Sequence, residues 1–383
     1  MAWWCLATAA IGIGIAAPVA WALAASSRKL GWTDRAGQEA HKLDARQVPN
    51  TGGLALGLGF ALPAGLVVAL GPALAGHLPL HDGARELLHN LANVRAEALA
   101  LLGAWVALFA VGWIDDRKGL GPWTKLAVQL AAAATVVTVG QTRALTALDQ
   151  WSAMGMAVSI ALSMAWIVVI TNAMNFMDNM DGLTGGVGAV AAIAFAVAAG
   201  IAGQWWVALV ASLLAGATLG VLALNAPPAK LFFGDSGALP LGLTLAWLAM
   251  RLTYFDSEGA GDASARWYAL LAPMLILAVP LYDAASVTLV RLRAGKSPLV
   301  GDHNHLSHRL VRLGLSKRRA VGVIVCLAVA TAGGGVMIGS LDPWQAWVVG
   351  GQAFAALLAL AILEHGAHRS PRGRRDDGPP PAA

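Results

Sequence analysis

The sequence predicts an all-α protein that crosses a membrane many times. Of its 383 residues, 57% are hydrophobic and only 12% are charged, whereas soluble domains carry about 25% charged residues. The apolar residues gather in runs of roughly 17–25 residues, which is the length that a helix needs to cross a bilayer. Repeated runs of this length exclude an ordinary soluble domain and favour a polytopic helical bundle.

Eleven apolar runs are candidate membrane spans. They lie at residues 2–25, 53–75, 96–114, 123–141, 155–172, 184–202, 205–224, 236–253, 268–290, 320–340 and 343–363. The first run has no basic residues before it and no convincing cleavage site, so we interpret it as a retained span rather than a signal peptide. Residues 1–365 then form a single transmembrane domain. The polar tail, residues 366–383, is expected to be disordered.

Lysine and arginine are concentrated in alternate connecting segments. If the N-terminus lies outside, the inward segments hold 21 of these residues and the outward segments hold 5. Because cytoplasmic loops are enriched in Lys and Arg, we expect an external N-terminus and a cytoplasmic C-terminus. The acidic positions at 115–116, 178–181 and 235 then all face the cytoplasm.

The segment from 172 to 186 is the strongest candidate functional motif. It places Asn175, Asp178 and Asp181 directly after an apolar run. Their spacing of three residues predicts that they share one helical face, and oxygen donors of this kind suit Mg²⁺. Carboxylates at a membrane boundary are costly and therefore indicate function. A helix cap, the simpler interpretation, explains one aspartate but not the aligned set.

Two further acidic motifs lie at the ends of other spans. Asp115 and Asp116 end one span and Lys125 opens the next, while Asp235 follows Phe232 and precedes a third. Adjacent helical residues point about 100° apart, so the paired carboxylates are expected to serve different partners. Lys125 is placed to pair with Asp116 or to hold a phosphate. The alternatives are a solvated helix end for the pair and a plain N-cap for Asp235.

The longest inward loop combines basic residues with His303, His305 and His308. This combination favours contact with a diphosphate or a sugar, and attraction to anionic lipid headgroups is the alternative. Asp283 lies within the ninth span. A hydrogen bond inside the bundle and a functional role are equally compatible with its position.

The ordered motifs DDRKGL, NAMNFMDNMDGLTGG, FFGDSG and SPLVGDHNHLSHRL carry a family resemblance. In this order they resemble the polyprenyl-phosphate N-acetylhexosamine-1-phosphate transferases, and the WecA and TagO branch most. The resemblance covers about residues 34–315. It implies transfer of a sugar 1-phosphate, with UDP-GlcNAc as the preferred donor, to undecaprenyl or another polyprenyl phosphate. UMP is released at the cytoplasmic face of the bacterial cytoplasmic membrane, initiating a cell-envelope polysaccharide or glycolipid.

The resemblance also implies roles for individual residues. It assigns Mg²⁺, with Mn²⁺ as a possible substitute, to Asp235 and Asn175. Catalysis is assigned to Asp115, Asp116 and Lys125, with Asp115 as the candidate base. The implied substrate contacts are Lys42, Asp178, Asp181, Phe232, His305 and His308. The resemblance allows a homodimer, and no nucleic-acid partner is expected.

Two positions depart from the family pattern. Asn179 stands where the family usually has glycine, and Ser307 stands where it usually has histidine. We expect Asn179→Gly to be tolerated. A transferase of the MraY type is disfavoured because a consecutive histidine run is absent from the sequence. An ion-coupled transporter is disfavoured because transporters bind near the membrane midplane, whereas these carboxylates lie at span ends.

Overall fold

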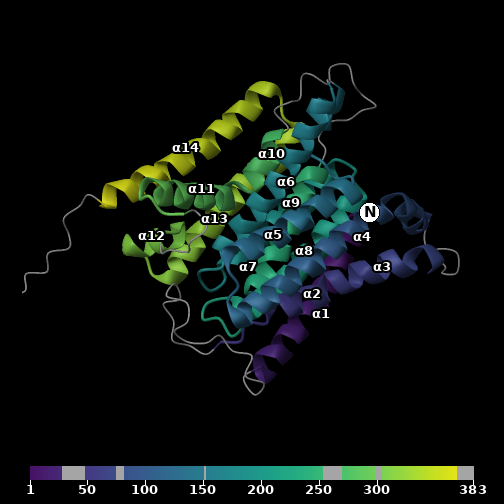
Figure 1. Cartoon of the computed structure of the whole chain (residues 1–383), viewed down its shortest axis with the longest axis horizontal. Coiled ribbons are helices and arrows are strands. Elements are labelled where there is room, and N and C mark those ends of the chain that lie inside the picture. The colour runs from purple at the N-terminus through teal and green to yellow at the C-terminus, as the bar shows by residue number, and fades with distance from the viewer. Residues whose placement is uncertain (28–47, 75–81, 151, 253–269, 298–303, 369–383) are drawn as a thin grey trace, which may run out of the picture.

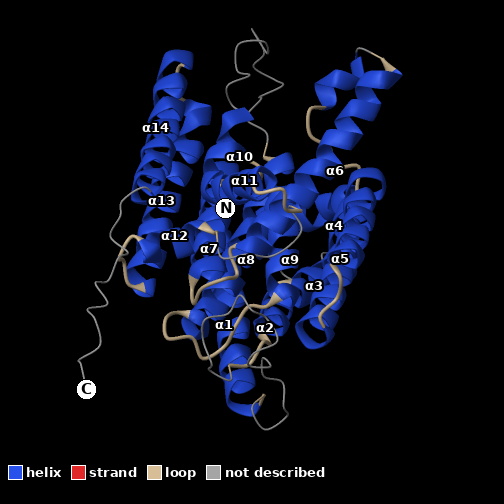
Figure 2. Cartoon of the chain, turned by 60° about the vertical axis from the view of Figure 1, so that its left-hand side comes forward, coloured by secondary structure: helices blue, strands red, loops and turns tan. Residues whose placement is uncertain are grey.

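A computed structural model describes residues 1–27, 48–74, 82–150, 152–252, 270–297 and 304–368. All regular elements within these ranges are helices, as the sequence predicts (Figures 1 and 2). In chain order they are α1 (Ala2–Ser26), α2 (Gly52–Gly59), α3 (Ala61–Leu74), α4 (Asp82–Lys118), α5 (Pro122–Ala134), α6 (Ala153–Phe176), α7 (Leu183–Ile201), α8 (Trp205–Asn225), α9 (Asp235–Arg251), α10 (Leu271–Ile276), α11 (Ala278–Arg293), α12 (Leu306–Arg312), α13 (Lys317–Met337) and α14 (Pro343–His368).

Eight helical segments of the described residues are long and apolar enough to cross a membrane. They are α1, the α2–α3 pair, α4 from Leu91, α6, α7, α8, α13 with its 3₁₀ extension to Ser340, and α14 to Glu364. The other three predicted spans coincide with shorter or broken helices. These are α5 with a π-helical turn at Thr135–Val139, the 17-residue α9, and the α10–α11 pair. The count of eleven spans and the orientation of the termini stay predictions.

Proline accounts for two breaks inside predicted spans. Proline has no N–H to bond the carbonyl four residues earlier, and its ring crowds that carbonyl. Pro63 stands four residues after Gly59, where α2 ends, and Pro280 stands four residues after Ile276, where α10 ends. Each predicted span is therefore built from two helical pieces.

One predicted boundary is wrong. We predict a span at 96–114 after an outward loop, but α4 begins at Asp82 and runs for 37 residues. The first turns of α4 contain residues with high helix propensity, but many of these residues are polar. A search for apolar runs therefore does not find this part of the helix. At the other end of the chain α14 ends at His368, and the expected disorder of the polar tail stays a prediction. The rest of that tail lies outside the described residues.

Helix α9 is the centre of the bundle. Every residue from Ser236 to Ala249 is buried, and α2, α4, α6, α7 and α8 pack around it (Figure 1). A helix that is apolar on all sides is typical of the core of a large protein or of a membrane span. By contrast, α14 lies beside α13 at one edge (Figure 2) and exposes most of its apolar side chains. The start of α9 is thus held among the ends of other helices, and the candidate site forms there.

Candidate active site

Four helix ends bring together residues from three separate sequence motifs. Lys125, at the start of α5, donates hydrogen bonds from Nζ to Asp115 Oδ2 at 3.1 Å and to Asp235 Oδ2 at 3.0 Å. Asn175, near the end of α6, donates from Nδ2 to Asp235 Oδ1 at 2.7 Å. We call these four residues the Asp235 cluster. Its members are all residues to which the sequence assigns catalysis or metal binding.

Lys125 is the shared counter-charge of the cluster. Two carboxylates that approach one ammonium group this closely would repel each other without it. The Asp115 side chain is mostly buried, and its second oxygen, Oδ1, accepts the backbone N–H of Leu120 at 2.6 Å. The sequence left open a pairing of Lys125 with Asp116, but the lysine lies between Asp115 and Asp235 instead.

Asp116 has a different function from its neighbour, as the 100° divergence of adjacent helical residues predicts. Its Oδ1 accepts the backbone N–H of Asp235 at 2.8 Å, and its Oδ2 accepts that of Ser236 at 3.1 Å. Asn50 Nδ2 donates a third hydrogen bond to Oδ1 at 2.9 Å. Asp116 therefore caps the first turn of α9 from another helix, where a negative charge also stabilises the helix dipole.

Two glycines allow α4 and the loop before α9 to approach this closely. A Cβ added at Gly112 would lie 2.5 Å from backbone atoms of Asp235, so only glycine lets α4 cross there. Gly234 has a φ of +66°, which favours glycine, and a Cβ at this residue would collide with the Asn50 and Asp116 side chains. Gly112 and Gly234 are thus needed for α4 and α9 to approach closely enough to form the site.

The Asp235 cluster has a donor set that fits a magnesium ion. In the described part of the chain no group of three His, Cys, Asp or Glu residues is placed to hold a metal. Magnesium, however, usually takes one or two carboxylates together with waters and substrate phosphates. Asp115 and Asp235 supply the carboxylates. The Asn175 amide nitrogen now points at Asp235. Rotating this amide by half a turn exchanges its nitrogen and oxygen, so that the oxygen can act as a ligand.

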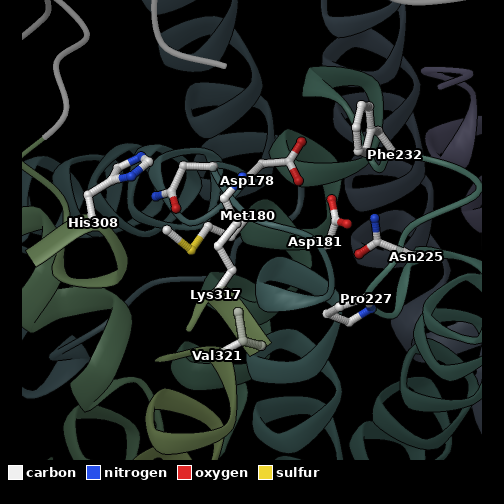
Figure 3. A pocket seen from close by; sticks show the side chains of 10 residues that line it. Asp178, Met180, Asp181, Asn225, Pro227, Phe232, His308, Lys317 and Val321 are labelled. Carbon is white, nitrogen blue, oxygen red and sulfur yellow. The ribbon is translucent and has the colours of Figure 1, made fainter. Parts of the chain in front are cut away.

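A pocket is formed by the turn after α6, the end of α8, the loop before α9, and α12 and α13, so two of its walls are close in sequence to Asn175 and Asp235 (Figure 3). It is lined by Asp178, Asn179, Met180, Asp181, Asn225, Pro227, Phe232, His308, Lys317 and Val321. Four of these were assigned to substrate binding from the sequence: Asp178, Asp181, Phe232 and His308. The structure brings them to a single concave surface.

The predicted common helical face for Asn175, Asp178 and Asp181 is wrong. Helix α6 ends at Phe176, and the residues that follow form a turn. Asn179 Nδ2 bonds back to the carbonyl of Phe176 at 2.6 Å, an interaction by which asparagine side chains compete with helix continuation. Consequently Asn175 stays on the helix and contacts Asp235, while the two aspartates line the pocket.

The two aspartates also hold the pocket wall. Asp181 Oδ2 accepts the backbone N–H of Ala229 at 2.9 Å, and Asp178 Oδ1 accepts the Thr184 hydroxyl at 3.2 Å. The first bond ties the turn after α6 to the loop before α9. Each carboxylate is therefore engaged within the protein, and both side chains also form part of the pocket lining.

His305 is held by Asp283, so this buried aspartate makes a hydrogen bond within the bundle, one of the two interpretations of its position, and that bond orients a residue assigned to substrate contact. Asp283 Oδ2 contacts His305 Nδ1 at 2.8 Å, and Oδ1 accepts the backbone N–H of Leu306 at 2.6 Å. The imidazole also packs against the Phe176 ring, with 5.6 Å between ring centroids. His305 is not among the residues that line the pocket. Lys42 and His303 lie outside the described residues.

Sequence reasoning missed three residues of the site. Lys317 and Asn225 line the pocket, and Asn50 contacts Asp116. Asn225 also joins two loop segments of the wall, since its Oδ1 accepts the N–H of Gly182 at 3.0 Å and its Nδ2 donates to the carbonyl of Leu231 at 2.9 Å. Their positions in the sequence could have indicated a role in the site. Each of the three residues lies at the end of a predicted span, on the same side of the membrane as the acidic motifs.

Comparisons with known proteins identify the family. Residues 98–253 match the family model described as glycosyl transferase family 4. The chain is 34% identical to the decaprenyl-phosphate N-acetylglucosaminephosphotransferase of Mycolicibacterium smegmatis over 286 residues, 69% of each chain. It is 28% identical to the probable undecaprenyl-phosphate N-acetylglucosaminyl 1-phosphate transferase of Bacillus subtilis, over 63% of this chain and 66% of that protein.

A third relative is the undecaprenyl-phosphate α-N-acetylglucosaminyl 1-phosphate transferase of Haemophilus influenzae, which is 29% identical over 68% of this chain and 76% of its own length. The region matched by the family model includes the ends of α4 and α6 and the starts of α5 and α9, which together form the Asp235 cluster. The chain belongs to the polyprenyl-phosphate N-acetylglucosamine-1-phosphate transferases of glycosyl transferase family 4.

Proposed function

We propose that this protein transfers GlcNAc 1-phosphate from UDP-GlcNAc to a polyprenyl phosphate, releases UMP, and thereby initiates a cell-envelope polysaccharide or glycolipid. The observation that carries the proposal is Lys125, which bridges Asp115 and Asp235 where three motifs of the family meet. The relatives named above act on polyprenyl phosphates, and their names specify N-acetylglucosamine.

The chemistry is a phosphoryl transfer. An oxygen of the lipid phosphate forms a bond to the sugar-bearing β-phosphorus of the nucleotide sugar. The bond from that phosphorus to the bridging oxygen breaks, and UMP leaves with the electron pair. Because the lipid phosphate is already an anion, catalysis consists mainly of positioning and charge stabilisation. A general base such as Asp115 contributes less than the cations of the site.

The residues divide between two tasks. The pocket lined by Asp178, Asp181 and Phe232 takes the nucleotide, and the Phe232 ring is the surface on which its nucleobase stacks. The Asp235 cluster takes the diphosphate. Asp235, Asn175 and Asp115 would hold Mg²⁺, which supplies neutralisation of the leaving diphosphate charge when bound. Lys125 provides a fixed positive charge next to these ligands.

We place the site at the cytoplasmic boundary of the bacterial membrane. The excess of Lys and Arg on the same side of the predicted spans supports this orientation. A lipid phosphate reaches that boundary from the bilayer, and a nucleotide sugar reaches it from the cytosol.

The test uses the purified protein in detergent with undecaprenyl phosphate and Mg²⁺. UDP-GlcNAc, UDP-GalNAc and UDP-MurNAc-pentapeptide are offered separately, and UMP release is measured. UMP from UDP-GlcNAc alone is expected. Release from UDP-MurNAc-pentapeptide alone would instead identify a transferase of the MraY type. No UMP from any donor, with a known transferase active in parallel, would contradict the proposal.

A further inference from the structure

The two departures from the family pattern contact each other. Ser307 Oγ, on α12, donates a hydrogen bond to Asn179 Oδ1, in the turn after α6, at 2.5 Å. Ser307 is only 1% exposed, so this contact forms away from solvent. The other end of the Asn179 amide donates to the carbonyl of Phe176, which fixes the orientation of the acceptor. Residues 128 positions apart in the chain are thus joined by a fully oriented bond.

This bond lies between two walls of the nucleotide pocket. Asn179 lines the pocket itself, together with Asp178 and Asp181 of the same turn, whereas His308, the neighbour of Ser307, lines it from α12. Figure 3 shows His308 across the pocket from Asp181, with Asp178 between them. A shift of α12 relative to the turn would therefore change the width of the pocket.

Helix α12 has only seven residues, and helices this short depend on tertiary contacts for their position. On one side Asp283 of α11 accepts the first N–H of α12, that of Leu306, and Arg309 Nη2 donates to Ser286 Oγ at 2.7 Å. Those contacts tie α12 to α11. The Asn179–Ser307 bond ties it to the turn that carries Asp178 and Asp181.

We infer that Asn179 and Ser307 are a matched pair of positioning residues that holds His308 at a set distance from Asp178 and Asp181 and so determines the KM for the nucleotide sugar. The inference rests on the proposed function. Ser307 is too deeply buried to contact a substrate, so it acts through its partner. Asn179→Gly removes the same acceptor, so the inference predicts a rise in KM for this variant, in place of the tolerance expected from the sequence.

The experiment is a double-mutant cycle with Asn179→Ala, Ser307→Ala and the combined variant. A neutral hydrogen bond contributes about 1 kcal/mol, which corresponds to roughly a fivefold change in affinity. Each single variant is expected to raise the KM for UDP-GlcNAc about fivefold, and the double variant no further. The kcat and the KM for the lipid phosphate should change less than about twofold. Ser212→Ala, which removes another buried serine hydroxyl on α8, is the matched control.

Two results would overturn the inference. In the first, the effects of the single variants multiply in the double variant, so that the residues act independently. In the second, the KM stays at the wild-type value while the thermal unfolding temperature falls, so that the bond is purely structural. Titration of the same proteins with UDP by calorimetry separates this inference from the proposed function. If the wild type binds UDP but releases no UMP, the proposed function fails, while the cycle of Kd values still tests the pair.

Discussion

Asp116 Oδ1 accepts the backbone N–H of Asp235 at 2.8 Å, so the end of α4 caps the start of α9. This one contact sets the distance between the two acidic motifs. It also explains why two consecutive aspartates end α4, since Asp115 pairs with Lys125 while Asp116 holds the helix that carries Asp235. The geometry of the charged cluster thus depends on a carboxylate that is not itself in it.

Asp116→Asn is expected to destabilise the protein and lower its activity. The amide keeps one acceptor, but its NH₂ group faces a backbone donor, and the charge that complements the start of α9 is lost. A buried donor that loses its acceptor costs about 1–3 kcal/mol. Thermal unfolding in detergent and UMP release measure the two effects. Asp149→Asn, which removes a carboxylate paired with Arg143, is the control, and equal behaviour of both variants would contradict the capping function.

Asp235→Asn is expected to abolish turnover. The carboxylate contacts both Lys125 and Asn175, and the amide cannot balance the lysine charge or bind a divalent cation as strongly. Removal of one electrostatic group from an active site typically lowers kcat about 10²–10³-fold, and loss of a metal ligand adds to this. The measurement is UMP release from folded, monodisperse protein. Near-normal activity would mean that the site lies elsewhere.

Asp115→Asn is expected to lower turnover strongly but less completely. The amide oxygen still accepts from the N–H of Leu120, and Lys125 keeps its bond to Asp235. Because the lipid phosphate is already anionic, loss of a base is less damaging than loss of the metal site. The kcat of the two variants is compared under the same conditions. A larger defect in Asp115→Asn than in Asp235→Asn would reverse the order of importance proposed here.

Removal of divalent cations is expected to stop the reaction. EDTA should abolish UMP release and excess MgCl₂ should restore it, with MnCl₂ as a possible replacement, because the donors of the cluster are oxygens of two carboxylates and an amide. Ca²⁺, which prefers more ligands at longer distances, should restore less. Full activity in EDTA would show that Lys125 alone neutralises the diphosphate.

Asp283→Asn is expected to lower kcat/KM about tenfold. The variant keeps an acceptor for the N–H of Leu306 but loses the charge that faces His305 and, at 3.8 Å, Arg309. Loss of a charge-assisted hydrogen bond costs about 1.5–3 kcal/mol. Steady-state kinetics with varied UDP-GlcNAc provides the measurement. A variant with wild-type kinetics would restrict Asp283 to a packing function.

The sequence was most predictive where chemistry and helix ends coincide. Asp115, Asp235 and Asn175 each end or begin an apolar run, so their convergence follows from alternating spans. The turn at 177–182 was not predictable in this way, because the helix stops through a side chain of Asn179 rather than at a glycine or proline. Asn225 and Lys317 were missed for a related reason: their place in the pocket depends on how α8 and α13 pack, which no local pattern records.

The most direct test of the account follows the β-phosphorus of the donor. UDP-GlcNAc labelled at that phosphorus is incubated with the protein, undecaprenyl phosphate and Mg²⁺, and lipid and nucleotide are separated. Transfer of a sugar 1-phosphate predicts that the label moves into the lipid together with GlcNAc, in amounts equal to the UMP released. Label that remains in the nucleotide as UDP, while GlcNAc alone enters the lipid, would contradict the account.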